Sequence, residues 1–279
     1  MQKSEENAEY CLNLVRSGDP DRYLLSLFAP QKAHRNLWAL YAFNQEVAKI
    51  RETVSEPMLG EIRIQWWQDV LREITEGNVR EQPIIIELAK LLQEHTSIEG
   101  DLHELLTARK NELAGEGSAN FNSLKSYAFQ VGGTLYCAAS KIIHSNLTLE
   151  AQDTAKKLGA AWAMLGLVRA LPHSWQTNAA PRTDEMRPGL QSQDAVDANA
   201  LLQPIVSKML EFTEEQAELA KQNKIVKSER SILLLATQLN LYQKNLQAVG
   251  NNPFELVNAE PSQLRKLSSL FWANLTKRF

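Results

Sequence analysis

Cysteine is almost absent from this chain, and several motifs that would place a protein in a familiar functional class are absent too. The 279 residues include only Cys11 and Cys137, without a CxxC pair. Two distant thiols exclude a disulfide framework and a cysteine-rich zinc site, and they fit a reducing compartment. The five histidines are scattered without metal-ligand spacing. The chain has no P-loop, no G-x-G-x-x-G and no recognisable Ser or Cys nucleophile motif.

Long apolar runs and an excess of positive charge are also missing. The longest apolar stretch, residues 158–168, is too short to span a bilayer. A net charge of −3 and a pI near 6.0 argue against a nucleic-acid partner. The first ten residues, MQKSEENAEY, are polar and acidic, unlike a secretory signal or an Arg-rich transit peptide. We therefore expect a soluble protein, cytoplasmic in a bacterium, or one peripheral to the inner membrane.

Helical periodicity is what the chain does contain. Apolar residues recur at helical spacing, and no convincing alternation typical of strands appears. The stretch 37–71 predicts two helices with a break at 55–57, because Pro57 disfavours helical geometry at Glu56. The length is sufficient for one helical unit with a full core. We therefore expect an all-α fold in a single domain, residues 1–279.

Residues 41–52, which read YAFNQEVAKIRE, carry the most specific motif. They resemble the first active-site helix of the squalene/phytoene synthase family, which usually reads YAF-C-R-x-x-D-D-x-x-D. In that family the aspartates hold Mg²⁺ against a prenyl diphosphate. Tyr41 and Phe43 match the motif and are therefore candidate ligand-binding residues. The resemblance implies an isoprenoid (prenyl) synthase-like helical bundle around a central cavity.

The match departs where the chemistry of that family lies. Asn44 and Gln45 stand at the Cys-Arg pair, Ala48 and Lys49 stand at the Asp-Asp pair, and Glu52 alone keeps a carboxylate. Mg²⁺ prefers hard oxygen ligands, usually carboxylates together with phosphate oxygens and water. Ala48 offers no ligand, and Lys49 places a cation where the metal would sit, although it could hold a phosphate directly. Lys49 and Glu52 remain candidate ligand-binding residues.

A second family motif falls in residues 157–174, which read KLGAAWAMLGLVRALPHS. It resembles the segment L-G-x-A-x-Q-L-T-N-I-L-R-D-V-x-x-D. Four polar positions of that segment are changed, with Ala163 for Gln, Gly166 for Asn, and Ala170 and Ser174 for the two aspartates. Arg169 is kept. An arginine on an apolar helix needs an acidic or phosphate partner if it is buried. Arg169 is therefore a candidate ligand-binding residue, and we predict Glu52 as its acidic partner.

Three further regions hold candidate ligand-binding residues. Arg35 is either a solvated helix-face arginine or a phosphate contact. Trp66 and Trp67 match a tryptophan-rich segment of the family, and core packing is favoured over ligand contact. Tyr127 opens a segment that resembles Y-x-x-x-V-A-G-x-V-G, and its Gly132-Gly133 pair predicts the close approach of a helix or a ligand.

The C-terminal segment, residues 261–279, combines an apolar helix face with positive charge. The expected face contains Leu264, Leu267, Leu270, Phe271 and Leu275, and the basic residues are Arg265, Lys266, Lys277 and Arg278. No acid follows Glu260. This mixture suits a membrane surface, and it also suits a last core helix with a solvated basic face.

Several short motifs resemble one branch of the family, the assembly factors of respiratory complex I and their bacterial relatives. That branch shows F-N-x-E-x-A, V-S-E, a tryptophan pair and L-R-A-x-P, and the corresponding stretches here are 43–48, 54–56, 66–67 and 168–172. The resemblance implies a pseudoenzyme with no cofactor and no metal. Its partners would be subunits of a membrane respiratory complex or its assembly machinery.

Two other functions stay open. The first is an active transferase that condenses two prenyl diphosphates head to head, with Mg²⁺ held by Glu46, Glu52 and Glu56. The second is a protein that binds an isoprenoid or another lipid in the cavity without catalysis.

Overall fold

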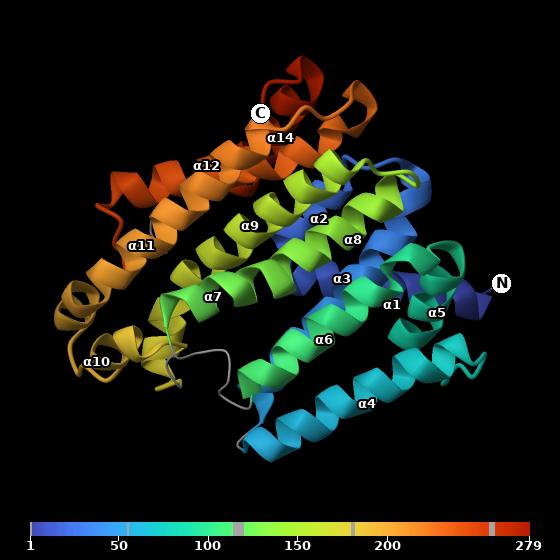
Figure 1. Cartoon of the computed structure of the whole chain (residues 1–279), viewed down its shortest axis with the longest axis horizontal. Helices are drawn as coiled ribbons and strands as arrows, with labels where there is room; N and C mark the ends of the chain where they lie inside the picture. The colour runs from blue at the N-terminus through green and yellow to red at the C-terminus, as the bar shows by residue number, and fades with distance from the viewer. Residues whose placement is uncertain (1, 55, 114–119, 180–181, 257–259) are drawn as a thin grey trace. The chain divides into compact units, whose positions relative to one another are not determined.

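Every regular element in the described part of the chain is a helix (Figure 1). The computed structural model describes residues 2–54, 56–113, 120–179, 182–256 and 260–279. Within these residues no strand occurs. The predicted all-α fold class is therefore confirmed, and the periodicity of the sequence explains it because apolar residues recur on one face of each long helix.

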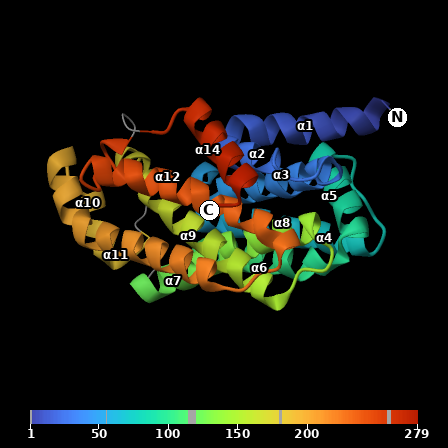
Figure 2. The same ribbon diagram turned by 90° about the horizontal axis from the view of Figure 1, so that it is seen from above.

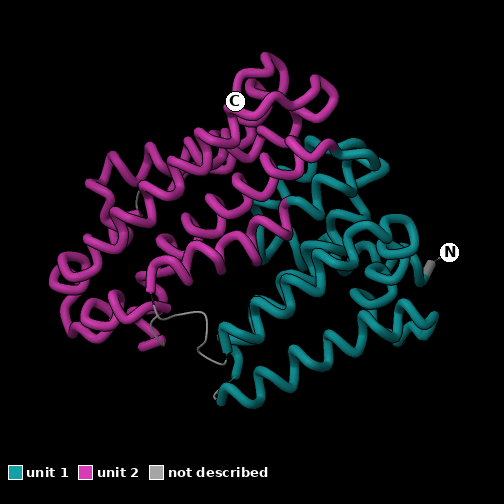
Figure 3. The backbone as a smooth tube through the Cα atoms, in the orientation of Figure 1, with its two compact units in different colours: residues 1–114, 137–147 teal, residues 115–136, 148–279 magenta. Residues whose placement is uncertain are grey.

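Contacts divide the chain into two units, which Figure 3 distinguishes by colour. Unit 1 contains residues 1–114 and 137–147, and unit 2 contains residues 115–136 and 148–279. The helix α8 (Thr134–Ile143) begins in unit 2 and continues into unit 1. That the chain forms a single domain stays a prediction.

Unit 1 is built around α3, which lies against α1 and α5, while α4 lies against α6 (Figures 1 and 2). Besides part of α8, the helices of this unit are α1 (Gln2–Gly18), α2 (Pro20–Ser26), α3 (Gln31–Thr53), α4 (Pro57–Thr75), α5 (Pro83–Glu94) and α6 (Glu99–Leu113). The break predicted in the stretch 37–71 is confirmed, because α3 ends at Thr53 and α4 begins at Pro57. Ser55 lies outside the described residues.

The core of unit 1 follows the apolar spacing of α3. Leu40, Phe43, Val47 and Ile50 are buried and recur at intervals of three or four residues. Burial of each large apolar side chain contributes roughly 1.5–3 kcal/mol relative to exposure. This anchored face fixes the rotation of α3 and therefore decides which of its polar residues reach a surface.

Unit 2 is built around α9, which lies against α11, α12 and the π-helical turn η2. Its elements are α7 (Phe121–Ala128), η2 (Phe129–Gly133), α9 (Leu149–Gln176), η3 (Asp184–Met186), α10 (Arg187–Leu190), α11 (Ala195–Gln222), η4 (Lys227–Leu233), α12 (Leu234–Ala248) and α14 (Gln263–Thr276). Asp194 caps α11 by accepting hydrogen bonds from the backbone N–H groups of Val196 and Asp197.

Glycines bring η2 and α9 together. A Cβ on Gly132 would overlap the carbonyl oxygen of Gly159, and a Cβ on Gly133 would lie 2.9 Å from the carbonyl oxygen of Lys156. The close approach predicted from the Gly-Gly pair is confirmed, and the approaching element is a helix. Gly159 shows the reciprocal constraint, because its own Cβ would overlap the carbonyl oxygen of Gly132.

The last helix, α14, leaves an apolar face uncovered within unit 2. Leu270 and Ala273 are buried, while Leu264 and Trp272 are 80% and 61% exposed. Of the residues expected on one broad apolar face, Leu270 is buried, whereas Leu264, Phe271 and Leu275 are exposed. Across the described helices, α14 included, none is both long enough and apolar enough to cross a bilayer.

Candidate functional site

Unit 1 contains a cavity of about 680 Å³ between α1, α3, α4 and the start of α5. Its volume falls in the range of roughly 300–1,000 Å³ that is usual for small-molecule sites. Tyr10 contributes from α1 and Ile84 from α5. Because four helices meet here, no single stretch of sequence defines the cavity.

One face of α3 supplies one wall of the cavity. Glu46, Lys49, Ile50 and Thr53 line it, and their spacing of three, four and seven residues places them on the same side of a helix. Ile50 is buried, whereas Lys49 and Thr53 are exposed. The wall is therefore apolar inside and polar at its rim.

The tryptophan pair of α4 supplies the opposite wall. Trp66 and Trp67 both line the cavity, with their ring centroids 5.0 Å apart in an edge-to-face arrangement. Trp67 is buried and makes a second edge contact with Phe43, at 5.1 Å. Trp66 is half-buried, and the guanidinium of Arg80 lies 5.1 Å from its ring centroid. Core packing, the favoured role of the pair, describes Trp67, yet both rings also reach the cavity.

Two cations and one carboxylate stand at the cavity. Lys49 and Glu46 come from α3, and Arg63 comes from α4. The Arg63 guanidinium donates a hydrogen bond of 2.9 Å to the Thr53 hydroxyl, which holds it one helical turn from Lys49. Among the described residues, neither cation forms an ion pair with a carboxylate.

Most of the first-motif residues lie on another side of α3. Asn44, Ala48 and Glu52 are spaced by four residues and share a face that is roughly 150° around the helix from the cavity wall. Asn44 is buried, Ala48 is half-buried and Glu52 is exposed. Gln45 is buried too, and a Cβ on Gly18 would overlap its side-chain amide. The cavity therefore includes Lys49 but not these neighbours.

Tyr41 and Phe43 are core residues of unit 1. Phe43 is fully buried, and Tyr41 is buried with the Arg22 guanidinium 6.0 Å from its ring centroid. Burial raises the pKa of the Tyr41 hydroxyl, so the group stays protonated at neutral pH. Neither side chain lines the cavity.

The donor set does not fit a magnesium cluster. Glu46 and Glu52 are six residues apart and point about 120° away from each other on α3. Glu56 stands before the first residue of α4. In the portion of the chain that the structure describes, no group of three or more His, Cys, Asp or Glu side chains could hold a metal ion. Mg²⁺ usually requires carboxylates gathered around one point.

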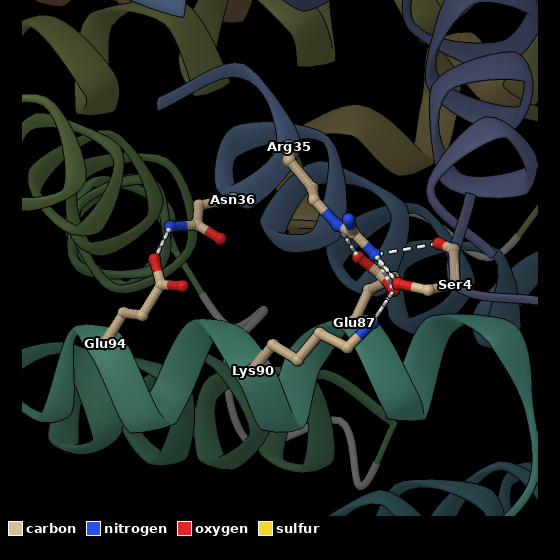
Figure 4. A network of polar contacts seen from close by, with 6 residues as sticks. All are labelled: Ser4, Arg35, Asn36, Glu87, Lys90 and Glu94. Atoms are coloured by element: carbon tan, nitrogen blue, oxygen red, sulfur yellow. Dashed lines mark hydrogen bonds and ion pairs between the residues drawn. The ribbon is translucent and has the colours of Figure 1, made fainter. Parts of the chain in front are cut away.

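Arg35 lies in a network of polar contacts that joins α1, α3 and α5 (Figure 4). Its guanidinium forms an ion pair with Glu87, and Nη2 also donates a hydrogen bond of 2.8 Å to the Ser4 carbonyl oxygen. Lys90 donates a 2.7 Å hydrogen bond to the same carboxylate. Neither predicted role of Arg35, a solvated residue or a phosphate contact, describes this ion pair.

The Glu87 carboxylate is almost completely buried, with 1% of its side chain exposed. Burial raises its pKa, but the hydrogen bonds from Arg35 and Lys90 outweigh burial, so the pKa lies below its usual value. Burial and the charge of Glu87 raise the pKa of the nearby Cys11 thiol to about 12. Cys11 is therefore an unreactive core thiol.

In unit 2, Arg169 forms its ion pair with Glu260 at 2.8 Å. The prediction of Glu52 as the partner is wrong, since Glu52 forms no ion pair among the described residues. The Arg169 guanidinium also stacks 4.1 Å from the Tyr242 ring centroid, and the Lys266 ammonium lies 5.0 Å from the same ring. These contacts give Arg169 a structural role in unit 2.

The other positions of the second motif are small or exposed. Ala163 lies beside Gly132 at the helix contact, whereas a Cβ on Gly166 would meet no described atom within 4 Å. Ala170 is exposed and Ser174 is half-buried. Tyr127 is buried near Arg182, whose guanidinium lies 5.6 Å from its ring centroid.

The sequence signalled only part of the cavity. Lys49, Trp66 and Trp67 were predicted as ligand-binding residues and do line it. Arg63 and Tyr10 were not predicted. Arg63 precedes Trp66 by one turn on α4, which is a local signal, whereas the position of Tyr10 depends on the packing of α1 against α3 and α5.

The fold is that of the isoprenoid synthases. The chain superposes on a solved dehydrosqualene synthase with a TM-score of 0.77 and 16% identity, covering 99% of this chain and 98% of the other. The squalene synthase HpnC from Alicyclobacillus acidocaldarius gives a TM-score of 0.71 and 14% identity, over 91% of this chain and 98% of the other. Such identities establish the fold alone.

The family is established by sequence. Residues 15–271 match the squalene/phytoene synthase family, and the chain belongs to it. The resemblance read from the two motifs is confirmed.

Curated relatives carry the name "NADH dehydrogenase (ubiquinone) complex I, assembly factor 6". The Bos taurus protein is 32% identical over 164 residues, which cover 59% of this chain and 49% of that protein. The Homo sapiens protein is 31% identical over 164 residues, which again cover 59% of this chain and 49% of that protein. A Dictyostelium discoideum homolog is 21% identical over 272 residues, covering 92% of this chain and 75% of that protein. The chain thus spans about half the length of the mammalian relatives it matches.

Proposed function

We propose that this chain is a non-catalytic member of its family that assists the assembly of complex I or a similar membrane respiratory complex. The observation that carries the proposal is the match to proteins named as complex I assembly factors, at 32% identity over 164 residues. The partners would be subunits of that complex or its assembly machinery.

The absence of catalysis is supported by the side chains at the family's metal positions. Ala48 and Lys49 on α3, and Ala170 and Ser174 on α9, bring no carboxylate to these positions. The Mg²⁺ of a prenyl transferase would neutralise the charge of the leaving diphosphate. A chain with Glu52 as its remaining carboxylate has too few ligands for that work.

A location at the cytoplasmic face of the bacterial inner membrane is supported by α14. Its exposed apolar residues Leu264, Phe271, Trp272 and Leu275 lie on a segment whose charges after Glu260 are all positive. Such a segment can insert its apolar face among lipid headgroups while its exposed cations, Arg265, Lys277 and Arg278, meet anionic lipids; Lys266 is buried and takes no part.

Deletion and rescue in the source organism test the proposal. Assembled complex I is measured on native gels, together with NADH:quinone oxidoreductase activity of the membranes. We expect both to fall when the gene is deleted and to return when the full chain is supplied. Normal levels of assembled complex in the deletion strain would refute the assembly role.

The competing function, a head-to-head transferase, has its own assay. The purified chain is incubated with Mg²⁺ and radiolabelled farnesyl or geranylgeranyl diphosphate, and binding and product are followed separately. We expect no product and no Mg²⁺-dependent binding. Turnover to a squalene- or phytoene-like product would refute the hypothesis that the chain is non-catalytic.

A further inference from the structure

We infer that the cavity of unit 1 binds an amphiphile that carries one negative charge on its head. The cavity lies between α1, α3, α4 and the start of α5, on a different face of α3 from Asn44, Ala48 and Glu52. Of the positions on α3 where the family places its metal ligands, the cavity includes Lys49 but not Ala48 or Glu52. The inference goes beyond the assembly role, and its test does not depend on that role.

The inner part of the cavity suits an apolar chain. Ile50, Trp67 and Ile84 line it and are buried, and Trp66 adds a half-buried ring. Removal of apolar ligand surface from water contributes roughly 25 cal/mol per Å². A volume of about 680 Å³ gives room for such a chain without a rearrangement of the helices.

The rim suits an anionic head. Lys49 and Arg63 both line the cavity, and Thr53 connects them: its hydroxyl donates a 3.0 Å hydrogen bond to the Lys49 carbonyl oxygen and accepts one of 2.9 Å from the Arg63 guanidinium. Cations that line one cavity and have no carboxylate partner among the described residues are available to bind an anion.

Other arginines of unit 1, unlike Arg63, form ion pairs with carboxylates. Arg51 pairs with Glu112 at 2.6 Å, and Arg80 pairs with Glu73 at 2.6 Å. Arg72, two turns beyond Trp66 on α4, pairs with Asp69 at 2.9 Å. Lys49 and Arg63 differ from these residues because, within the described residues, no carboxylate neutralises them.

Glu46 limits the charge that the rim accepts. It comes from the same face of α3 as Lys49, so the rim has two positive charges and one negative charge. The sum favours a head with one negative charge, such as a carboxylate. A diphosphate, with several negative charges, would leave charge unmatched and would meet repulsion from Glu46.

The test uses the purified full chain and isothermal titration with dodecanoate, kept below its micelle concentration. Dodecanol supplies the chain without the charge, and acetate supplies the charge without the chain. We expect dodecanoate to bind at least tenfold more tightly than dodecanol, and acetate to show no measurable binding. Equal affinities for dodecanol and dodecanoate would overturn the assignment of the rim, and binding of acetate alone would overturn the role of the apolar wall.

Three variants test the residues. Lys49→Glu and Arg63→Glu should each weaken dodecanoate binding by about tenfold or more, because each reverses a charge at the rim. Lys32→Glu is the matched control, since Lys32 is an exposed residue of the same helix that does not line the cavity. Equal losses in all three variants would overturn the site.

Glu46→Gln separates the proposal from any effect of misfolding. This change removes the negative charge from the rim, so dodecanoate should bind several-fold more tightly. A gain in affinity cannot arise from a damaged fold. Unchanged or weaker binding would overturn the role of Glu46 in setting the charge of the rim.

Discussion

At the scale of single residues, the buried carboxylate of Glu87 holds together a network of ion pairs in unit 1. Its cations come from two helices, Arg35 from α3 and Lys90 from its own α5. Loss of one partner from a buried pair is destabilising because the other charge remains without full compensation. The pair therefore matters more to the fold than an exposed ion pair of the same length.

Arg35→Ala should lower the free energy of unfolding by about 2 kcal/mol, because Lys90 still compensates part of the Glu87 charge. Arg72→Ala is the matched control: the Arg72 side chain is 61% exposed and pairs with Asp69, and its loss should cost about 0.5 kcal/mol or less. Urea unfolding of the two variants measures the difference. Equal effects would mean that the burial of Glu87 is unimportant.

Glu87 also predicts a pH dependence. Its pKa is lower in the folded chain than its ordinary value of 4.5, so the folded state binds fewer protons than the unfolded state. The stability from this group is complete above that value and is lost as the pH falls through the folded pKa. The difference in unfolding free energy between the wild type and Glu87→Gln should therefore shrink between pH 6 and pH 3.5. A difference that is constant over this range would contradict the assignment.

For Arg169, the sequence indicated that the guanidinium requires an acidic partner, but it did not indicate which residue that partner is. Its place on an apolar helix predicted an acidic partner, and the structure provides one. The partner is Glu260, 91 residues further along, rather than Glu52. Helical periodicity contains no information about which distant segment will lie beside a given turn.

At the scale of elements, the close approach of η2 to α9 gives different roles to two helical glycines, Gly132 and Gly166. Gly132 has a carbonyl oxygen of α9 where its Cβ would be, and Gly166 has open space. The first glycine is required by packing, whereas packing in the described structure does not require the second.

Gly132→Ala should destabilise the chain by about 1–3 kcal/mol, because the added methyl group forces the two helices apart. Gly166→Ala should be neutral or should stabilise the chain by up to about 1 kcal/mol, because alanine is the better helix former. Thermal unfolding followed by circular dichroism compares the two. The reverse order of stability would show that the helices do not meet at Gly132.

The exposed face of α14 gives a second prediction for an element. The wild type should float with phosphatidylglycerol vesicles and much less with phosphatidylcholine vesicles, and salt should weaken the binding. The double variant Phe271→Ser/Trp272→Ser should lose most of this flotation. Val196→Ser, which removes an exposed apolar residue from α11, is the control and should float like the wild type. Equal flotation of the double variant would contradict the role of this face.

At the scale of the whole molecule, the sequence predicted the fold far better than the site. Helical spacing recurs along the whole chain, which was sufficient to predict the all-α class. Two long motifs, each contained in one stretch of sequence, were sufficient to predict the family. The cavity depends on four helices that meet in unit 1, so nothing in the local sequence identified Tyr10, and the place of Arg63 one turn before Trp66 was its only local signal.

The proposed role can be located in the molecule by comparing variants in the deletion strain. Glu52→Ala should restore complex I assembly completely, because Glu52 is exposed and has no ion pair among the described residues. Phe271→Ser/Trp272→Ser should restore it poorly, because the chain would reach the membrane less often. Both variants must be present at wild-type levels on immunoblots for the comparison to hold. If Glu52→Ala failed and the α14 variant succeeded, the role would depend on the family's old carboxylate position, and the search for a transferase reaction would have to be reopened.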